Sequence, residues 1–389
     1  MKNWCLSKFI QNKIQRVRLY WRLLILNFKV ARYSSPDSDD NPVVFFNASA
    51  RLEGLNLNAA FGMISSWALQ LRGKKILHVG CHSAMKQCVL GAVVAGPESL
   101  PPCKGCIQDT RWFTAAAPTI WFDYQDNPEL RSKISEIKLD NLSEFVYRGM
   151  PLGSLILPSL RWVLRRFHLH PDQQMHYLVR SFLLSAAGIA DQMEDLISKH
   201  QPETVVVFNG LQYPEAVVRW KAQQHNIRVI TYESNLMPFS AFFTDQQATI
   251  YPMEIPDDFE LSAEQNQKLD SYLSKRFQGD FTMAGIQFWP GMQDLPKEFL
   301  NRVKSFQGVV PIFTNVIFDT SQVHANTLFE DMFSWLDDVL SFVRENPEIL
   351  FVIRAHPDEI RPGKSSQESV AKWIEDQKME NLLNLVFIP

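Results

Sequence analysis

The stretch "FVIRAHPDEIRPGKSS" (351–366) joins a buried-strand pattern to a dense cluster of charge. Apolar and β-branched residues run directly into Arg354, His356 and Pro357. In open α/β sheets, ligands bind in the crevice beyond the carboxyl ends of the strands. Arginine offers a fork of donors to a phosphate, and histidine can donate to a phosphate oxygen. The stretch predicts a strand that ends at an anion site, and the alternative is a strand end capped by solvated charge.

Short apolar runs alternate with helical patterns on both sides of this strand. The expected strands are 43–47, 74–80, 119–124, 204–210, 227–234, 308–316, 349–357 and 382–389. The expected helices are 57–71, 213–226, 326–345 and 366–378, and residues 130–200 read as mostly helical. Strands that alternate with helices favour parallel pairing, with helices on both faces of the sheet. The expected fold class is therefore α/β with two Rossmann-like domains.

Four segments follow from this pattern and from changes in composition. They are a basic amphipathic N-terminal segment (1–36), a first Rossmann-like domain (40–255), a connector (256–305) and a second Rossmann-like domain (306–389). The second domain has only three expected strands, and a doubly wound sheet normally has more. We expect the chain to be truncated in this domain. The alternative is a small three-stranded subdomain that is complete.

Bulk composition excludes several classes of protein. The chain has 389 residues, of which 46% are hydrophobic and 21% charged, with a formal net charge of −3. This balance is ordinary for a globular protein and gives no sign of a nucleic-acid partner. Five cysteines in a chain of this length do not form a disulfide scaffold. No uninterrupted apolar run is long enough for a transmembrane helix.

The first 36 residues carry basic residues and no acidic residue. The basic residues are Lys2, Lys8, Lys13, Arg16, Arg18, Arg22, Lys29 and Arg32. Leucine, isoleucine and aromatic residues lie between them, and the run lacks the clean apolar core of a secretory signal. A basic helix of this composition is typical of attachment to an anionic membrane surface. The alternative is a helix that packs on its own domain.

Four cysteines lie close together in the sequence, in "GCHSAMKQC" (80–88) and "PPCKGC" (101–106). They are Cys81, Cys88, Cys103 and Cys106. The spacing of the last two allows both sulfurs to reach one ion, with Gly105 relieving a tight turn. A structural zinc or an iron–sulfur cluster could use this set. Reduced, partly buried thiols and a redox dithiol are the alternatives.

Two stretches resemble a known group of enzymes. "RAHPDEIRPGKSSQESVAKWI" (354–374) and "PIFTNVIFDTSQVHANTLFEDMFSWL" (311–336) are similar to the second domain of bacterial capsule and surface-polysaccharide glycosyltransferases. Those enzymes have the GT-B fold, which consists of two Rossmann-like domains. The resemblance covers about 80 residues well, counted from these two stretches and the strand after them, and the first domain more loosely.

The resemblance implies transfer of a sugar from a nucleotide-activated donor to a growing capsule or surface polysaccharide, or to a lipid-linked glycan. The donor would sit between the domains, mainly on the second. His356 and Arg354 would hold its phosphates, and His356 would also stabilise the leaving phosphate. Asn315 and Asp319 would line the same cleft from the neighbouring strand end. Glu359 closes the charged cluster and belongs to the same expected nucleotide-binding set.

An inverting sugar transfer needs a general base at the acceptor hydroxyl. The first domain would supply it, and three carboxylates lie at expected strand-to-loop junctions there: Glu53, Glu215 and Glu233. We prefer Glu53, because the following Gly54 permits close approach of the backbone. Each of the three could instead cap a helix or lie on the surface.

Two further interpretations stay open. A polyol-phosphate transferase or a nucleotide-sugar 2-epimerase of similar fold would share the same strand-end cluster. A non-enzymatic cysteine–metal α/β scaffold at the membrane would explain the cysteines and the basic segment instead. Our expectation from the sequence is a cytoplasmic transferase, peripheral on the inner face of the cell membrane.

Overall fold

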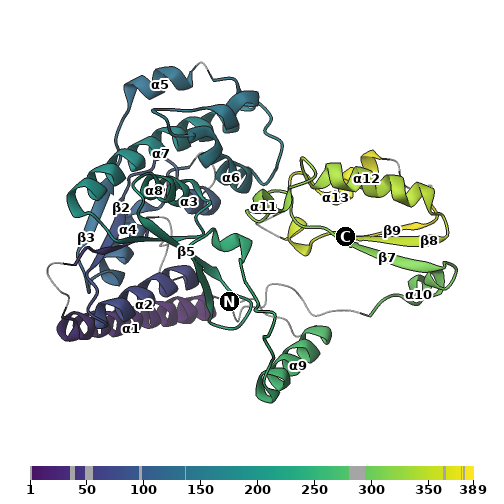
Figure 1. Cartoon of the computed structure of the whole chain (residues 1–389), viewed down its shortest axis with the longest axis horizontal. Coiled ribbons are helices and arrows are strands. Elements are labelled where there is room, and N and C mark those ends of the chain that lie inside the picture. The colour runs from purple at the N-terminus through teal and green to yellow at the C-terminus, as the bar shows by residue number, and fades with distance from the viewer. Residues whose placement is uncertain are drawn as a thin grey trace. The chain divides into compact units, whose positions relative to one another are not determined.

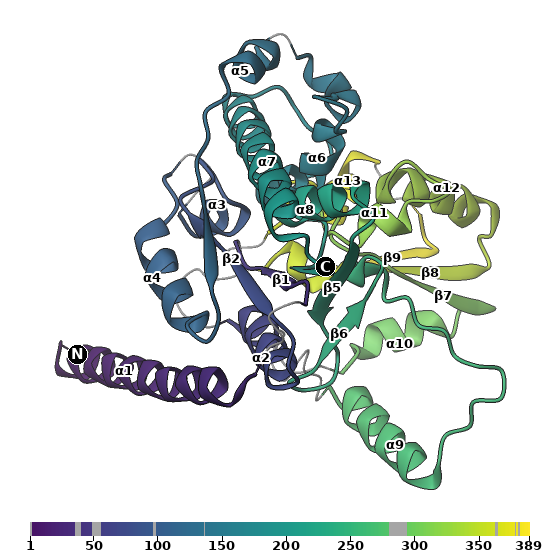
Figure 2. The same cartoon turned by 60° about the vertical axis from the view of Figure 1, so that its left-hand side comes forward.

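The computed structural model confirms the α/β class. It describes residues 2–35, 40–48, 56–95, 99–135, 137–279, 294–361, 365–377, 379 and 382–389, and the side chains of these residues except 2–13 and 93–95. The chain divides into two compact units. Unit 1 comprises residues 1–159, 171–234 and 241–248, and unit 2 comprises residues 160–170, 235–240 and 249–389. Figures 1 and 2 show their elements.

Unit 1 is built on a six-stranded sheet of order β3-β2-β1-β4-β5-β6. The strands are β1 (Val43–Phe46), β2 (Ile76–His82), β3 (Thr119–Asp123), β4 (Thr204–Phe208), β5 (Arg228–Ser234) and β6 (Ala241–Thr244). All neighbours are parallel except β5 and β6, which pair antiparallel. The strand order reverses between β1 and β4, which makes a topological switch point of the kind where ligands bind.

Helices cover both faces of this sheet (Figure 1). The helices of unit 1 are α1 (Lys2–Tyr33), α2 (Leu57–Leu71), α3 (Val89–Ala95), α4 (Cys103–Phe113), α5 (Pro128–Ile134), α6 (Leu152–Leu164, whose last residues belong to unit 2), α7 (Gln173–His200) and α8 (Tyr213–Gln224). Helix α8 packs on β4 and β5, and α7 packs on α8. On the other face α2 contacts the sheet, and α1 lies across α2 and α4. The basic N-terminal segment is therefore helical, as expected.

Local sequence explains where several helices begin. Asn56 precedes α2, and its side chain accepts a hydrogen bond from the N–H of Ala59 at 2.7 Å. Asp172 does the same for α7 through the N–H of Met175 at 2.7 Å. Such caps satisfy backbone donors that have no partner within the helix. They fix the residue at which each helix begins.

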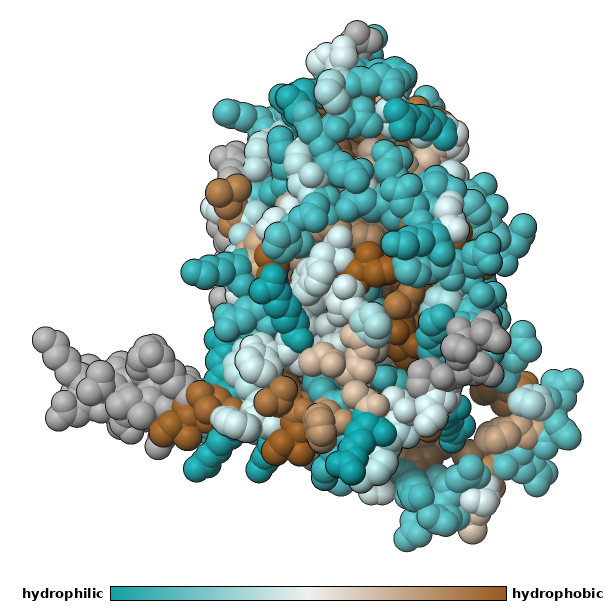
Figure 3. Space-filling model, turned by 90° about the vertical axis from the view of Figure 1, so that its left-hand side faces the viewer, coloured by the Kyte–Doolittle hydropathy of each residue, from teal (hydrophilic) through white to brown (hydrophobic). Residues whose placement is uncertain are grey.

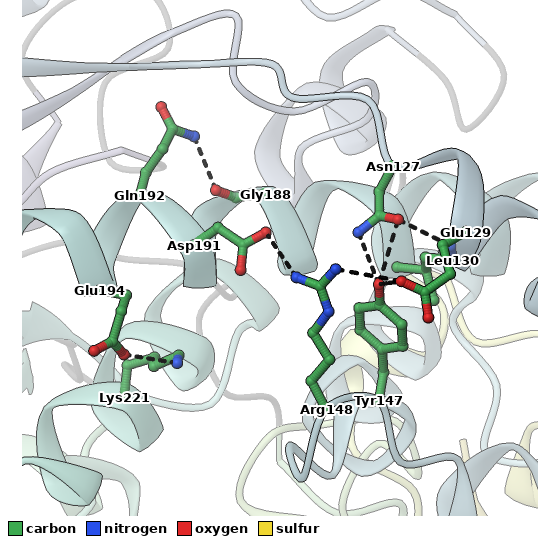
Figure 4. Close-up of polar contacts among 10 residues, drawn as sticks. All are labelled: Asn127, Glu129, Leu130, Tyr147, Arg148, Gly188, Asp191, Gln192, Glu194 and Lys221. Atoms are coloured by element: carbon green, nitrogen blue, oxygen red, sulfur yellow. Dashed lines mark hydrogen bonds and ion pairs between the residues drawn. The ribbon is translucent and has the colours of Figure 1, made fainter.

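A network of polar side chains fastens α5 and the following loop to α7 (Figure 4). The Arg148 guanidinium lies 3.3 Å from Glu129 and 3.9 Å from Asp191. The Tyr147 hydroxyl donates to Glu129 at 3.2 Å and contacts Asn127. All these charges have partners within the network, so we assign it to the architecture of unit 1.

Unit 2 contains a parallel three-stranded sheet of order β7-β8-β9. Its strands are β7 (Gly308–Phe313), β8 (Ile349–Arg354) and β9 (Leu385–Ile388). Its helices are α9 (Ala263–Phe277), α10 (Lys297–Val303), α11 (Gln322–Ala325), α12 (Met332–Glu345) and α13 (Val370–Asp376). Leu336, Leu340 and Val343 of α12 pack in one core with Ile353 of β8 and Val370 of α13.

The structure differs from the sequence-based elements in two informative places. Strand β6 is absent from the prediction, because its four residues "AFFT" lack an alternating pattern and pair only through the backbone of β5. The prediction of a tight turn at Cys103–Cys106 is wrong, since both cysteines lie in the first turn of α4. Pro101 and Pro102 precede that turn, and proline favours the start of a helix.

Candidate functional site

His356 lies just beyond the carboxyl end of β8, in unit 2. Its Nδ1 accepts a hydrogen bond from the N–H of Asp358 at 3.1 Å, which begins a short 3₁₀ turn. Burial lowers the pKa of His356, and this effect outweighs Asp358 and Asp319, which raise it. The ring is therefore neutral at pH 7, and its proton lies on Nε2. His356 thus carries its one N–H donor on Nε2.

Two arginines lie near this histidine and also lower its pKa, namely Arg361 and Arg354. Arg361 forms an ion pair with Asp358 at 3.1 Å. Arg354 donates to the backbone carbonyls of Ile388, at 3.3 Å, and Pro389. Arg354 would have to release these carbonyls before it could bind a phosphate. The structure brings Arg354 and His356 together, as expected, and adds Arg361 to them.

The loop after β7 lies beside the end of β8. Thr314 donates from its backbone to the carbonyl of Arg354 at 3.1 Å, which ties the two strand ends together. Within the loop, Asn315 donates to the Ser321 hydroxyl at 3.1 Å. Asp319 accepts from the Ser321 N–H at 2.8 Å and acts electrostatically on His356. Asn315 and Asp319 therefore belong to one ordered loop next to His356.

Glu359 has a different environment from the rest of the cluster. It is buried, and its carboxylate accepts from the N–H of Val370 at 3.1 and 3.3 Å. Val370 is the first residue of α13, so Glu359 caps that helix. Burial raises the pKa of Glu359 to about 7, and the Val370 N–H lowers it by less. The geometry therefore gives Glu359 a structural role, in which it holds the start of α13 near the end of β8.

A cavity of about 350 Å³ opens beside the loop after β7. Its walls combine aromatic rings with side-chain amides. They include Phe313, Phe329, Trp335, Asn315, Gln322 and Asn326. Its one carboxylate, Asp331, already has partners within the protein. It accepts a hydrogen bond from the N–H of Phe333 at 2.7 Å and forms an ion pair with His168 at 3.2 Å. Flat aromatic and neutral amide walls suit a planar heteroaromatic ring.

A second cavity, of about 390 Å³, lies between α12, α13 and residues 166–170. Its walls carry three carboxylates, Asp337, Glu368 and Asp376. His168 joins its rim and pairs with Glu368 at 3.0 Å and with Asp331 at 3.2 Å. The cations Arg166 and Lys372 line the same walls, so the charge of this cavity does not by itself disfavour a phosphate. The cavity beside β7 is the better nucleotide candidate because Asn315, in the loop next to His356, forms part of its wall.

In unit 1, polar residues gather where the parallel strands end. His82 ends β2 and Asp123 ends β3, and their Nδ1 and Oδ1 atoms lie 2.7 Å apart. Both side chains are exposed. When neutral His82 donates from Nδ1 to Asp123, its Nε2 is left as an acceptor. This is the arrangement of a general base oriented by a carboxylate.

Of the three carboxylates proposed from the sequence, Glu233 lies at a strand end. It accepts from Asn209 at 2.8 Å, and Asn209 follows β4 with a φ of +58°. Glu215 is buried in the first turn of α8. Glu53 lies outside the described residues. The preference for Glu53 stays a prediction.

The four cysteines gather in one region of unit 1 as free thiols. Burial raises the pKa of Cys81 to about 11 and that of Cys88 to about 12, and the nearby thiols Cys103 and Cys106 add to this effect. Among the side chains that the structure describes, no group of three or more potential ligands is arranged to hold a metal ion. Metal ligation requires thiolates, whereas this environment favours neutral thiols. Zinc or a cluster at these cysteines stays a prediction.

Sequence reasoning missed two parts of these sites. No sequence signal joined His82 to its partner Asp123, which is far away in the chain. Gln322 and the aromatic residues around it lie within the quoted stretch 311–336, but no spacing rule marks them as a cavity. The signal that could have found His82 and Asp123 is position, since both lie within two residues of the ends of the predicted strands 74–80 and 119–124.

Comparisons with known proteins give the following. No protein-family model matches the sequence. No curated protein matches it either. Among solved structures, UDP-GlcNAc 2-epimerase from Neisseria meningitidis, bound to UDP-GlcNAc, is similar with 10% identity and a TM-score of 0.24, over 89% of this chain and 71% of that chain.

Two more solved structures are similar. A Streptomyces glycosyltransferase complexed with thymidine diphosphate aligns with 11% identity and a TM-score of 0.24, over 85% of this chain and 73% of that chain. Tyrosyl-tRNA synthetase from Leishmania major, with tyrosinol, aligns with 9% identity and a TM-score of 0.27, over 93% of this chain and 82% of that chain. At these TM-scores the alignments carry no functional argument, which rests on the residues of this chain.

Proposed function

We propose that this chain is a glycosyltransferase that takes a sugar from a nucleotide-activated donor. The observation that carries the proposal is the strand-end cluster of unit 2. There a neutral histidine, two arginines and an ordered loop lie at the carboxyl ends of two parallel strands. A cavity with aromatic and amide walls adjoins that loop. This is the position at which α/β sheets bind ligands.

In this proposal, the donor's phosphates bind at His356 and Arg361, with Arg354 joining them after it releases the backbone of β9. His356 donates from Nε2 to a phosphate oxygen. That hydrogen bond strengthens as the leaving nucleotide gains negative charge, and so stabilises the transition state. The nucleobase lies in the cavity, against Phe313 or Trp335, with Gln322 contacting its polar edge.

In this proposal a general base activates the acceptor hydroxyl. The His82–Asp123 pair has the geometry of an oriented base, and Glu53 is the candidate from the sequence. Attack by the activated hydroxyl on the anomeric carbon breaks the bond to the nucleotide, which leaves as a nucleoside phosphate. The proposed acceptor, from the resemblance, is a capsule or surface polysaccharide or a lipid-linked glycan.

The first experiment is a binding screen on the full chain. Thermal shift and calorimetry with nucleoside mono- and diphosphates should identify one base class that raises Tm. His356→Ala should weaken that binding at least about tenfold, since a hydrogen bond to a charged ligand is lost. Arg344→Ala, an exposed cation on α12, is the matched control. Equal binding by His356→Ala and wild type would contradict the proposed phosphate site.

A second pair of variants tests the proposed nucleobase site, the cavity beside β7. Gln322→Leu should reduce the preference for one base over the others, while Gln267→Leu, at an exposed position on α9, should leave it unchanged. Product analysis then separates the reactions. Nucleotide release that requires an acceptor supports a transferase. Conversion of the donor into its 2-epimer without any acceptor would replace the proposal with the epimerase alternative.

A further inference from the structure

Helix α1 uses only one narrow stripe to pack on unit 1. Tyr20, Leu23, Asn27 and Val30 recur every three or four residues, which places them on one side of the helix. Leu23 and Val30 are buried, and Asn27 donates to the carbonyl of Trp112 at 2.9 Å. Trp67 of α2 donates to Asn27 in turn, at 3.1 Å. The helix is thus fixed to its unit by this stripe.

The opposite side of α1 is apolar and exposed. Its residues share one side of the helix and are Ile14, Val17, Trp21, Leu24, Ile25 and Phe28. Trp21 is 62% exposed and Phe28 is 65% exposed. Isolated apolar residues on a surface are ordinary, but a continuous stripe of large ones marks an interaction site. Figure 3 shows groups of hydrophobic side chains at the lower left of this face, with hydrophilic ones beside them.

A row of positive charge borders the apolar stripe. Arg18, Arg22 and Lys29 are four and seven residues apart, so they lie on one side of the helix, next to Ile14 and Ile25. All three are exposed. Over residues 14–35 the helix and its end contain no aspartate or glutamate. The exposed side of α1 therefore pairs large apolar groups with uncompensated positive charge.

This combination distinguishes between two occupants. A second copy of the chain would bring the same basic row against the stripe and would supply no carboxylate from its own α1. An anionic bilayer supplies apolar chains for the stripe and negative headgroups for Arg18, Arg22 and Lys29. Tryptophan also suits this boundary, because its ring is apolar while its N–H remains wet. None of the helices in the described part of the chain is long and apolar enough to span the bilayer.

We propose that the exposed side of α1 docks this protein on an anionic lipid bilayer, with the helix lying in the plane of the interface. The buried stripe holds the helix to unit 1, so docking brings the whole unit to the membrane surface. Helix α2, beside it, exposes Ile64 and Leu71, which add apolar area on a neighbouring element. The inference is independent of nucleotide binding and of catalysis.

The test is sedimentation of the purified full chain with vesicles, in the absence of nucleotide. Vesicles of phosphatidylcholine alone are compared with vesicles that contain about 30 mol% phosphatidylglycerol. We expect binding to the anionic vesicles only, weakened by about 0.5 M NaCl. The double variant Trp21→Glu with Phe28→Glu should bind at least about tenfold more weakly. The triple variant Arg18→Gln, Arg22→Gln and Lys29→Gln should bind about a hundredfold more weakly.

Phe342→Glu, at an exposed phenylalanine on α12, is the matched control and should bind as wild type does. Unchanged Tm in every variant shows that folding is intact, as expected for exposed positions. The proposal is overturned if wild type does not bind anionic vesicles, or if the double variant binds equally well. It is also overturned if wild type is dimeric in solution and the double variant is monomeric, because a second copy then covers the stripe.

Discussion

The backbone N–H of Asp358 donates to Nδ1 of His356, with 3.1 Å between the two nitrogens. This contact decides what the histidine can do. Because Nδ1 accepts, the proton of the neutral ring lies on Nε2. Burial lowers the pKa of His356, so the ring is neutral at pH 7 and still offers a donor. A phosphate at Nε2 would add negative charge beside the ring and raise its pKa.

Nucleotide binding should therefore take up a proton at about pH 6, close to the ordinary pKa of histidine. This proton goes to Nδ1, which then no longer accepts from the Asp358 N–H. Calorimetry in two buffers of different ionisation enthalpy measures this uptake directly. His356→Gln keeps a side-chain N–H donor but cannot titrate, so binding should persist with the uptake abolished. Identical binding enthalpies for wild type in both buffers would show that His356 does not change protonation in the complex.

The raised pKa of Glu359 predicts how the free energy of unfolding changes with pH. Its pKa is raised from 4.5 to about 7 by burial, so the folded state holds this proton more tightly than the unfolded state does. The resulting stabilisation is complete below about pH 4.5 and is lost as pH rises through about 7. Glu359→Gln keeps an oxygen for the Val370 N–H and removes the charge. It should be more stable than wild type at about pH 8, by about 3 kcal/mol at most.

The same comparison at about pH 5 should show little difference, because wild-type Glu359 is then protonated in the folded state. Thermal unfolding at both pH values measures this. Glu345→Gln, at an exposed position of α12, controls for removing a carboxylate from the surface. A constant difference between Glu359→Gln and wild type across this range would rule out the proposed titration.

Replacing His82 should lower kcat, with little change in KM for the donor. His82→Ala should lose about a hundredfold to ten-thousandfold in turnover, the usual contribution of a general base. Asp123→Asn should also lose activity, since it removes the charge that orients the ring. Initial rates with a competent acceptor check both. If Glu53→Gln abolishes turnover and His82→Ala does not, the base is Glu53 and His82 has another role.

The cysteines of unit 1 should differ in reactivity. Cys81 and Cys88 are buried with raised pKa values, whereas Cys103 is partly exposed. Because the thiolate is the reactive form, iodoacetamide at about pH 8 should modify Cys103 well before Cys81 or Cys88. Mass spectrometry after a timed reaction shows the order. Protection of all four thiols that disappears after a chelator is added would instead indicate a bound metal.

Elements that depend on local signals were predictable. The helix expected over 57–71 is observed over the same residues, because Asn56 caps it and its apolar period continues to Leu71. The strand 349–357 was expected slightly too long, since β8 ends at Arg354 and His356 begins a turn. Strand β6 and the helical turn at Cys103 depend on neighbouring elements or on context, and the sequence pattern missed both.

The candidate sites also contain some features that local sequence predicts and others that it does not. Position at a strand end identified Arg354, His356 and Asn315, because consecutive residues decide where a strand stops. Which side chains then meet is a different matter. Glu359 turns away to cap α13, and His82 meets Asp123 only because β2 and β3 are neighbours. Long-range strand pairing and burial decide both of these contacts, and the local sequence does not reveal either of them.

By itself, the sequence determined the α/β class, the parallel strands, the basic N-terminal helix and the charged end of β8, because periodicity and local charge are properties of adjacent residues. The tertiary structure alone decided which side of α1 is buried, which proton His356 carries and which residues line the cavity beside β7. Those features depend on residues that are distant in the chain, and only packing brings them together.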